Sequence, residues 1–215
     1  MTQDNTVKTN VVNSGDQTLL LVKGKAIQDE HEGKSYVKKL AQAILQVIQK
    51  HKEANLRCVG AASLNNAIKA IIISSGEAKI KGMNFTFVPN FQTVTFDSES
   101  EKTAISLKVL DTTFTPLSDN EKALLLIKGK GVQGETKVYV KKVSQAILQV
   151  IQKHEFADLR CVGAAALNNA VKSIIVAMGD ASIKGMKLAC VPNFQTITFE
   201  GSGEKTAILV KVVKL

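Results

Sequence analysis

The sequence predicts an α/β fold in which one βαβαββ module of about ninety residues occurs twice in tandem. Shifting the chain by 103 positions places residues 36–110 on residues 139–213, and 50 of these 75 pairs are identical. Upstream the offset is 105, because Lys23-Gly24-Lys25 corresponds to Lys128-Gly129-Lys130, so the second copy has a shorter first loop. Within each copy, short apolar runs alternate with segments of helical periodicity, which is typical of a small α/β (α+β) sandwich.

These repeats divide the chain into an N-terminal arm (1–18), expected to be flexible, a first module (19–110), a linker (111–123) and a second module (124–215). A module of this size buries only a modest fraction of its surface, so each copy gains stability by packing on the other. We expect the copies to pair like the subunits of a two-fold dimer, which makes an intramolecular pseudo-dimer.

The first half of each module predicts a strand and a long helix. Residues 19–22 and 124–127 are wholly apolar and precede a Lys-Gly-Lys turn, as expected for a buried strand that ends in a loop. From Tyr36 to His51 apolar residues recur at intervals of three and four, while lysine and glutamine occupy another face. That spacing predicts an amphipathic helix.

The middle of the module predicts a second strand and a second helix. Residues 56–59 form an apolar run of β type, and Gly60-Ala61-Ala62 allows a tight turn into the helix. We expect this helix to run to about Ser75 and to end at Gly76. Both helices are expected on one face of the sheet.

The last third of the module is rich in β-forming residues. Residues 85–88 and 94–96 are separated by Pro89-Asn90-Phe91, so they form either one interrupted strand or two short ones. A polar turn at 97–101 precedes the last strand at 103–110. This turn is acidic in both copies, and acidic side chains would be repelled by phosphates.

Charge gives the first indication of function. The net charge is +9, and counting by segment places +5 on residues 19–110 and +7 on residues 121–215, while the arm and the linker are slightly negative. Positive modules favour an anionic partner through long-range attraction and counterion release from phosphates. Many basic proteins bind no nucleic acid, so charge alone does not decide the function.

Several other function classes find no support in the sequence. No apolar run is long enough to span a bilayer, and the first eighteen residues lack the pattern of a secretory signal. The sequence contains no metal-ligand, nucleotide-loop or catalytic motif, and its three histidines form no catalytic group, so we predict no enzyme activity, metal or cofactor. Three cysteines, two of them at one repeat position, indicate core residues in a reducing, intracellular compartment.

One segment carries a family resemblance. LRCVGAASLNNAIK at residues 56–69 returns as LRCVGAAALNNAVK at 159–172, and it resembles the signature of stage V sporulation protein S (SpoVS). The FVPNF segment at 87–91 and the EKTAISLKV segment at 101–109, with their second-copy counterparts, are also similar to that family. Members are usually single-domain, so two tandem copies suggest a built-in dimer, and in this the chain is similar to tandem proteins linked to macronuclear development in ciliates.

The SpoVS family is similar in fold to the Alba proteins, which are βαβαββ modules that dimerise and bind DNA or RNA. The resemblance therefore implies two Alba-like modules and, less directly, nucleic-acid binding. It also implies that the turn at Lys23 and Lys25, and its counterpart at Lys128 and Lys130, corresponds to a lysine-bearing loop that meets nucleic acid. Lysine would position the phosphate backbone without reading bases. The alternative is a solvated turn.

Further candidate binding residues surround the second helix. The first backbone amides of this helix could hold an anion, and Arg57 (Arg160 in the second copy) precedes them on the strand. Alternatively, the glycine at the start of the helix simply permits close packing of strand and helix. Helix neighbours could converge at this end; they are Asn65, Asn66 and Lys69, with Asn168, Asn169 and Lys172 in the second copy. Alternatively, one asparagine faces solvent and the other bonds a neighbouring loop or crosses a dimer interface.

The first helix and the strand break supply the remaining candidates. Lysines in its first turns, Lys38, Lys39, Lys141 and Lys142, are unfavourable to the helix dipole, so an outside acceptor or a solvated face would explain them. Phe91 and Phe194 could stack on unpaired bases or pack in a core or interface.

The leading hypothesis is a non-enzymatic, backbone-directed DNA- or RNA-binding protein, expected in the nucleus or otherwise the cytoplasm, with no membrane contact and with possible further homo-oligomerisation. The alternative is a protein-interaction or assembly module whose positive charge is incidental.

Overall fold

The computed structural model describes residues 16–24, 30–96, 100–112, 120–129, 135–199 and 203–215. Most of the expected flexible arm, most of the linker, and the lysines at 25 and 130 lie outside these residues. The first module contains β1 (Leu19–Val22), α1 (Glu30–His51), β2 (Glu53–Cys58), α2 (Ala61–Ile80), β3 (Phe85–Phe96) and β4 (Ser100–Asp111). A short 3-10 helix, η2 (Glu121–Ala123), precedes the second module, which contains β5 (Leu124–Ile127), α3 (Thr136–His154), β6 (Phe156–Cys161), α4 (Ala164–Ile183), β7 (Leu188–Phe199) and β8 (Gly203–Lys214). The βαβαββ order is therefore present twice.

Three expectations about single elements were wrong. The strand β1 was expected to be buried, but it forms an edge of the sheet and only Val22 is buried. The helix α1 begins six residues before Tyr36. The helix α2 does not end at Gly76 but continues to Ile80 and is closed by Gly82, whose φ of 74° lies in the left-handed region that favours glycine.

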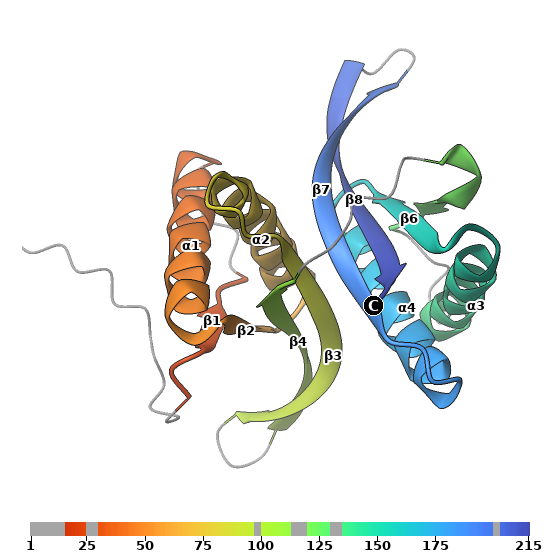
Figure 1. Ribbon diagram of the computed structural model, residues 1–215, viewed down its shortest axis with the longest axis horizontal. Helices are drawn as coiled ribbons and strands as arrows, with labels where there is room; N and C mark the ends of the chain where they lie inside the picture. Colours follow the sequence, from red (N-terminus) through yellow and green to blue (C-terminus); the bar gives the residue numbers. More distant parts are fainter. Residues whose placement is uncertain (1–15, 25–29, 97–99, 113–119, 130–134, 200–202) are drawn as a thin grey trace, which may run out of the picture.

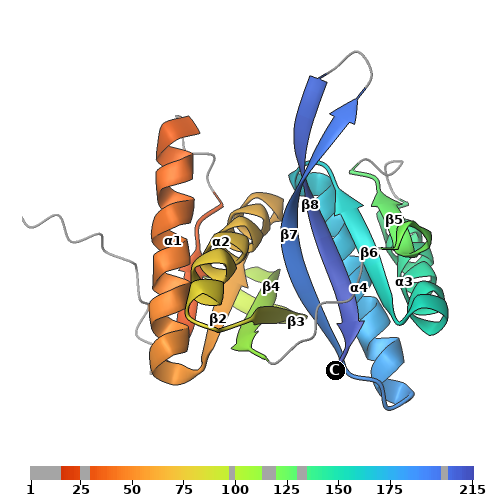
Figure 2. The same ribbon diagram turned by 45° about the horizontal axis from the view of Figure 1, so that its top comes forward.

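The stretch around Pro89 proved to be one strand. The strand β3 runs without a break from Phe85 to Phe96, and Pro89 is paired in register with Leu107 of β4. Beyond the ends of β2, residues 92–96 and 100–104 pair only with each other among the described residues. Figure 2 shows the corresponding β7–β8 ribbon rising clear of the module. Each module thus carries a two-stranded arm.

The two modules share one eight-stranded sheet in the order β1-β2-β4-β3-β7-β8-β6-β5. The joint is the antiparallel contact of β3 with β7, where Phe87 faces Cys190. Directly opposed residues of neighbouring strands point to the same face, and both of these side chains are fully buried. The helix-covered faces of the two modules are therefore one continuous face, as expected for helices on one side.

The larger hydrophobic core runs through both modules on that face, and a smaller cluster in the second module consists of Ala123, Phe156, Ala189 and Val213. At the centre of the larger core α2 contacts α4 and β7, and α4 contacts β3, so each second helix crosses to the other module. Figure 1 shows α1 and α3 at opposite sides of the molecule, outside this central pair. Cys58 and Cys161 are buried and free, as the repeat pattern predicts, and burial raises the pKa of each thiol to about 12. No helix in the described part of the chain is long and apolar enough to cross a bilayer.

Candidate nucleic-acid interface

The turn that follows β1 is held in place by two side chains of its own module. The backbone N–H of Lys23 donates to the Tyr36 hydroxyl (2.8 Å), and the Asn66 side-chain amide donates to the Lys23 carbonyl (3.1 Å). The second module repeats both contacts, with distances of 2.9 Å and 3.0 Å, using the equivalents of all three residues: Lys128, Tyr139 and Asn169. The backbone at each lysine is thus fixed, while its side chain is exposed.

The glycine of the turn lies against the start of the second helix. A Cβ at Gly24 would come within 3.2 Å of the Ser63 backbone nitrogen and 3.3 Å of its Cβ. At Gly129 the nearest atom, the Ala166 nitrogen, would be 3.3 Å away. Glycine favours the close approach of turn and helix, because a Cβ here would be in tight contact with the start of the helix.

One lysine of each first helix lies on the side of the helix that carries the turn-binding tyrosine. Lys38, Lys39, Lys141 and Lys142 are all exposed. Lys39 and Lys142 come three residues after the tyrosines that bind the turn, so they lie on a similar side of their helices. Lys38 and Lys141 come only two residues after the tyrosines, so they lie on another side of the helix. The group formed by the turn lysine and the helix lysine on the tyrosine side is named the lysine turn site: residues 23 and 39, or 128 and 142.

The two arginines lie on the open face of the sheet, opposite to the helices. Arg57 lies between the buried residues Leu56 and Cys58 on β2, so its side chain points to the opposite, open face of the sheet. There its Nε donates to the Gln92 side-chain oxygen (3.1 Å), and in the second module Arg160 donates to Gln195 (2.8 Å). Arg57 and Arg160 therefore lie on the face of the sheet opposite to the second helices that follow them.

Asn65 and Lys69 instead reach the other module. They line a pocket of about 150 Å³ whose opposite wall is formed by Gly163 and Ala164 at the start of α4, with Phe194 and Thr206 from β7 and β8. Asn66, one residue along, turns back to its own loop. The two neighbouring asparagines thus play different roles, since Asn66 binds a loop of its own module and Asn65 lines the pocket between the modules.

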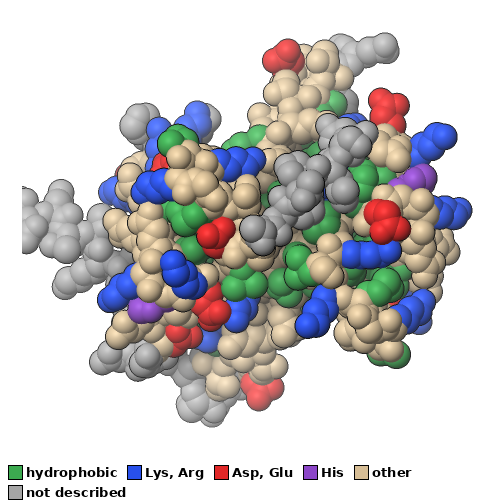
Figure 3. All heavy atoms as spheres, viewed as in Figure 1, with side chains coloured by type: hydrophobic (Ala, Val, Ile, Leu, Met, Phe, Trp, Pro, Cys, Tyr) green, Lys and Arg blue, Asp and Glu red, His purple; other side chains and the backbone are tan. Residues whose placement is uncertain are grey.

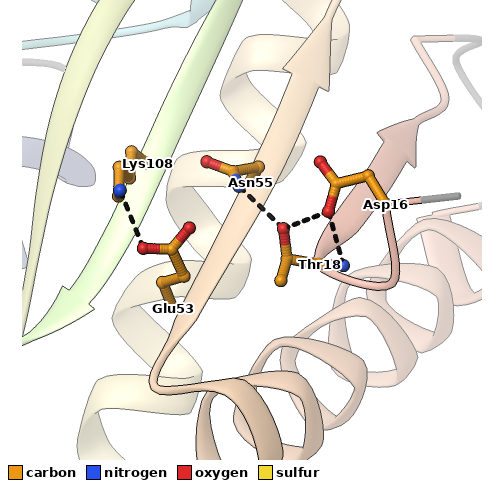
Figure 4. A network of polar contacts seen from close by, with 5 residues as sticks. All are labelled: Asp16, Thr18, Glu53, Asn55 and Lys108. Atoms are coloured by element: carbon orange, nitrogen blue, oxygen red, sulfur yellow. Dashed lines mark hydrogen bonds and ion pairs between the residues drawn. The ribbon is translucent and has the colours of Figure 1, made fainter. Parts of the chain in front are cut away.

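The open face differs between the modules. In the first module it carries an exposed polar network, shown in Figure 4. Asn55 donates to the Thr18 hydroxyl (2.8 Å), which donates in turn to Asp16 (2.6 Å), and Lys108 pairs with Glu53 (2.7 Å). Hydrogen bonds from Thr18 hold the pKa of the Asp16 carboxyl below its usual value.

In the second module the equivalent positions are buried. Lys211, the counterpart of Lys108, pairs with Asp158 at 2.9 Å, and its ammonium lies 3.7 Å from the ring centre of Phe156. The side chains of this ion pair are only 9% and 6% exposed, against 47% and 34% for the Lys108–Glu53 pair. The exposed polar network of the first module is therefore replaced by a buried ion pair in the second, while the arginine–glutamine contact is present on both open faces.

Basic side chains are distributed over both ends of the molecule. In the face shown in Figure 3, lysine and arginine side chains gather over the left and right modules, and hydrophobic side chains show mainly between them. This arrangement agrees with the positive charge counted for each module.

Sequence reasoning missed the residues that shape the site. Tyr36 and Tyr139 were assigned only to a helix, although they are the only two tyrosines of the chain and occupy one repeat position. Gln92 and Gln195, which bind the two arginines, were assigned no role. Identity between the two copies at rare residue types was the signal that could have found them.

A comparison with known protein families supports the resemblance seen in the sequence. Residues 32–112 and 132–215 each match the family described as stage V sporulation protein S. Each match spans one module from its first helix to its last strand. Membership is consistent with a non-enzymatic role. Because the two matches cover most of the chain, this protein belongs to the stage V sporulation protein S (SpoVS) family and carries the family's domain twice.

Proposed function

We propose that this protein binds DNA or RNA without catalysis, and that the two lysine turn sites contact the phosphate backbone. The observation that carries the proposal is the construction of the turn, in which Tyr36 and Asn66 fix the backbone of Lys23 while its side chain stays exposed. A preorganised turn lowers the ordering cost of each phosphate contact. Lysine side chains give such contacts little base preference.

The position of the two sites supports an extended ligand. β1 and β5 are the outermost strands of the shared sheet, so the lysine turn sites lie at opposite edges of the molecule. Seven inter-strand spacings of about 4.8 Å, added along the sheet, place these strands at most about 34 Å apart. One turn of B-form DNA covers a similar length, about 34–36 Å. A ligand of that length engages both sites of one molecule, which raises its affinity above that of a shorter ligand.

The test is a fluorescence anisotropy titration of labelled duplex DNA, single-stranded DNA and RNA over a series of salt concentrations. The slope of log K against log salt is negative, and each lost phosphate contact on duplex DNA reduces its magnitude by about 0.9. The double substitution Lys23→Ala and Lys128→Ala is expected to lower both affinity and slope.

The matched control removes the same charge elsewhere. Lys50→Ala with Lys153→Ala changes exposed lysines in the last turns of α1 and α3, about 21 Å along the helix axis from the two tyrosines. This control should retain most of the affinity. Absence of any binding by the unmodified protein at low salt would refute the proposal, and equal losses in both double variants would remove the lysine turn site from it.

A second function is supported by one observation. Ile80 and Ile183 occupy the same repeat position at the ends of α2 and α4, and their side chains are 89% and 86% exposed. Singly exposed aliphatic side chains are common on protein surfaces, so the feature that favours an assembly module is their repetition at equivalent positions of both copies. Concentration-dependent oligomers in size exclusion with light scattering, abolished by Ile80→Ser with Ile183→Ser, would support this function.

A further inference from the structure

We infer that the pocket between the modules holds an unpaired nucleobase, so that the protein prefers single-stranded nucleic acid to a duplex. This inference rests on the proposed nucleic-acid binding and specifies its substrate. The pocket of about 150 Å³ is large enough for one aromatic ring, since an engineered cavity of that size in another protein accepts benzene.

The pocket lining suits a base. Phe194 lines it with a side chain that is 43% exposed, which is unusual for a phenylalanine on the core face of a sheet. An exposed ring can stack on any base, because every base has a π-face. The Asn65 amide both donates and accepts hydrogen bonds, and the Thr206 hydroxyl does so too, so the polar edge of a single-ring pyrimidine base can be satisfied.

The polar groups of the α2 wall are available. Within the described part of the chain, neither Asn65 nor Lys69 has a hydrogen-bond or ion-pair partner. The two residues are one helical turn apart on α2 and both line the pocket, so an amide for the base and an ammonium for the adjoining phosphate lie on one wall. An apolar small molecule would leave both groups unused.

The second copy repeats this chemistry. Every residue that lines the pocket is identical at the equivalent position, whereas only 50 of 75 aligned positions are identical overall. Phe91, Asn168 and Lys172 therefore stand in the corresponding places on the other side of the joint. Residues of the open face are less similar, because Glu53 and Asn55 of the first copy correspond to Phe156 and Asp158 of the second. The residue types that line the pocket are thus the same in both copies, whereas residues of the neighbouring open face differ.

A base can enter such a pocket only when it is unstacked and unpaired. In a duplex each base is stacked and its Watson–Crick edge is occupied, so entry would require flipping at a cost of a few kcal/mol. Single strands avoid that cost. The lysine turn sites contact phosphates in either case, so duplex binding would persist but would be weaker.

The experiment compares labelled oligothymidylate and oligouridylate of about 12 nucleotides with a blunt duplex of about 12 base pairs, all at one salt concentration. The tested variant is Phe91→Leu with Phe194→Leu, which removes both rings and keeps apolar side chains. Phe91→Tyr with Phe194→Tyr keeps the rings and serves as the matched control. The leucine variant is expected to bind single strands about ten-fold more weakly and the duplex equally well, while the tyrosine variant binds like the unmodified protein.

Photocrosslinking of the unmodified protein to an oligonucleotide with 5-iodouracil gives an independent readout that does not depend on the stability of a variant. Crosslinks at Phe91 or Phe194, found by peptide mapping, support the inference. Crosslinks confined to other segments, or undiminished single-strand affinity in a folded leucine variant, overturn it and leave the lysine-directed binding intact. Failure of the unmodified protein to bind any of the three probes refutes both proposals.

Discussion

Phe87 and Cys190 face each other at the joint between β3 and β7, and they occupy the same position of the two repeats. The pseudo-two-fold axis of the protein therefore passes beside this pair. In a dimer of identical chains the same residue would have to pack against itself at such a point. In the tandem protein a large side chain faces a small one, and both are fully buried. Fusion of the repeats has allowed an asymmetric core at the axis.

Exchanging the two residues tests this size complementarity. Phe87→Cys is expected to reduce the free energy of unfolding by about 3 kcal/mol, because it leaves a cavity. Cys190→Phe should cost about 1–3 kcal/mol, because it overfills the joint. The double exchange should be more stable than the sum of the single costs predicts, with a coupling of at least about 1 kcal/mol in urea unfolding. Strict additivity would show that the two side chains do not pack as a pair.

Lys108 and Lys211 give a second matched comparison, since they are equivalent lysines in exposed and buried ion pairs. Lys211→Ala is expected to reduce the free energy of unfolding by about 3–5 kcal/mol, because the buried Asp158 carboxylate loses its ion-pair partner. Lys108→Ala should cost at most about 1 kcal/mol, because water solvates Glu53. Urea denaturation of the two variants measures the difference. Equal costs would contradict the assignment of a buried and an exposed pair.

The local order of the chain was predictable, because periodicity and turn residues act within a few positions. The end of α2 could not be predicted, because a glycine such as Gly76 costs only about 1 kcal/mol inside a helix and does not have to end it. Burial of Ser75 and Ala78, on either side of Gly76, outweighs that cost. The pocket was also beyond reach, because Asn65 meets Phe194 only after the modules pair. Sequence spacing describes one helix face but not the surface that it meets.

Burial of the cysteine thiols makes the stability of the protein depend on pH in the alkaline range. Burial raises the pKa of Cys58 and Cys161 to about 12 from an ordinary value of 9.0. Below pH 9 the thiols are protonated in both the folded and the unfolded chain, so the full stability is present. Above it, only the unfolded chain ionises, and stability falls until the pH approaches the folded-state pKa.

At about pH 10.5 each of these two thiols should lower the free energy of unfolding by about 2 kcal/mol relative to pH 8. Urea denaturation at both pH values measures the loss. The control is Cys58→Ala with Cys161→Ala, which is less stable at pH 8 but should lose correspondingly less stability at the higher pH. An unchanged loss in this variant would assign the alkaline effect to other groups.

Asn66 and Asn169 separate the shape of the lysine turn from its charge. Asn66→Ala with Asn169→Ala removes the amides that hold the carbonyls of Lys23 and Lys128 but leaves every charge in place. If the turns bind phosphate, affinity for nucleic acid should fall several-fold, because the turn must be ordered on binding. The salt slope should stay the same, whereas the lysine double variant lowers it. Anisotropy titrations at several salt concentrations measure both quantities, and a reduced slope in the asparagine variant would show that these amides do more than position the turn.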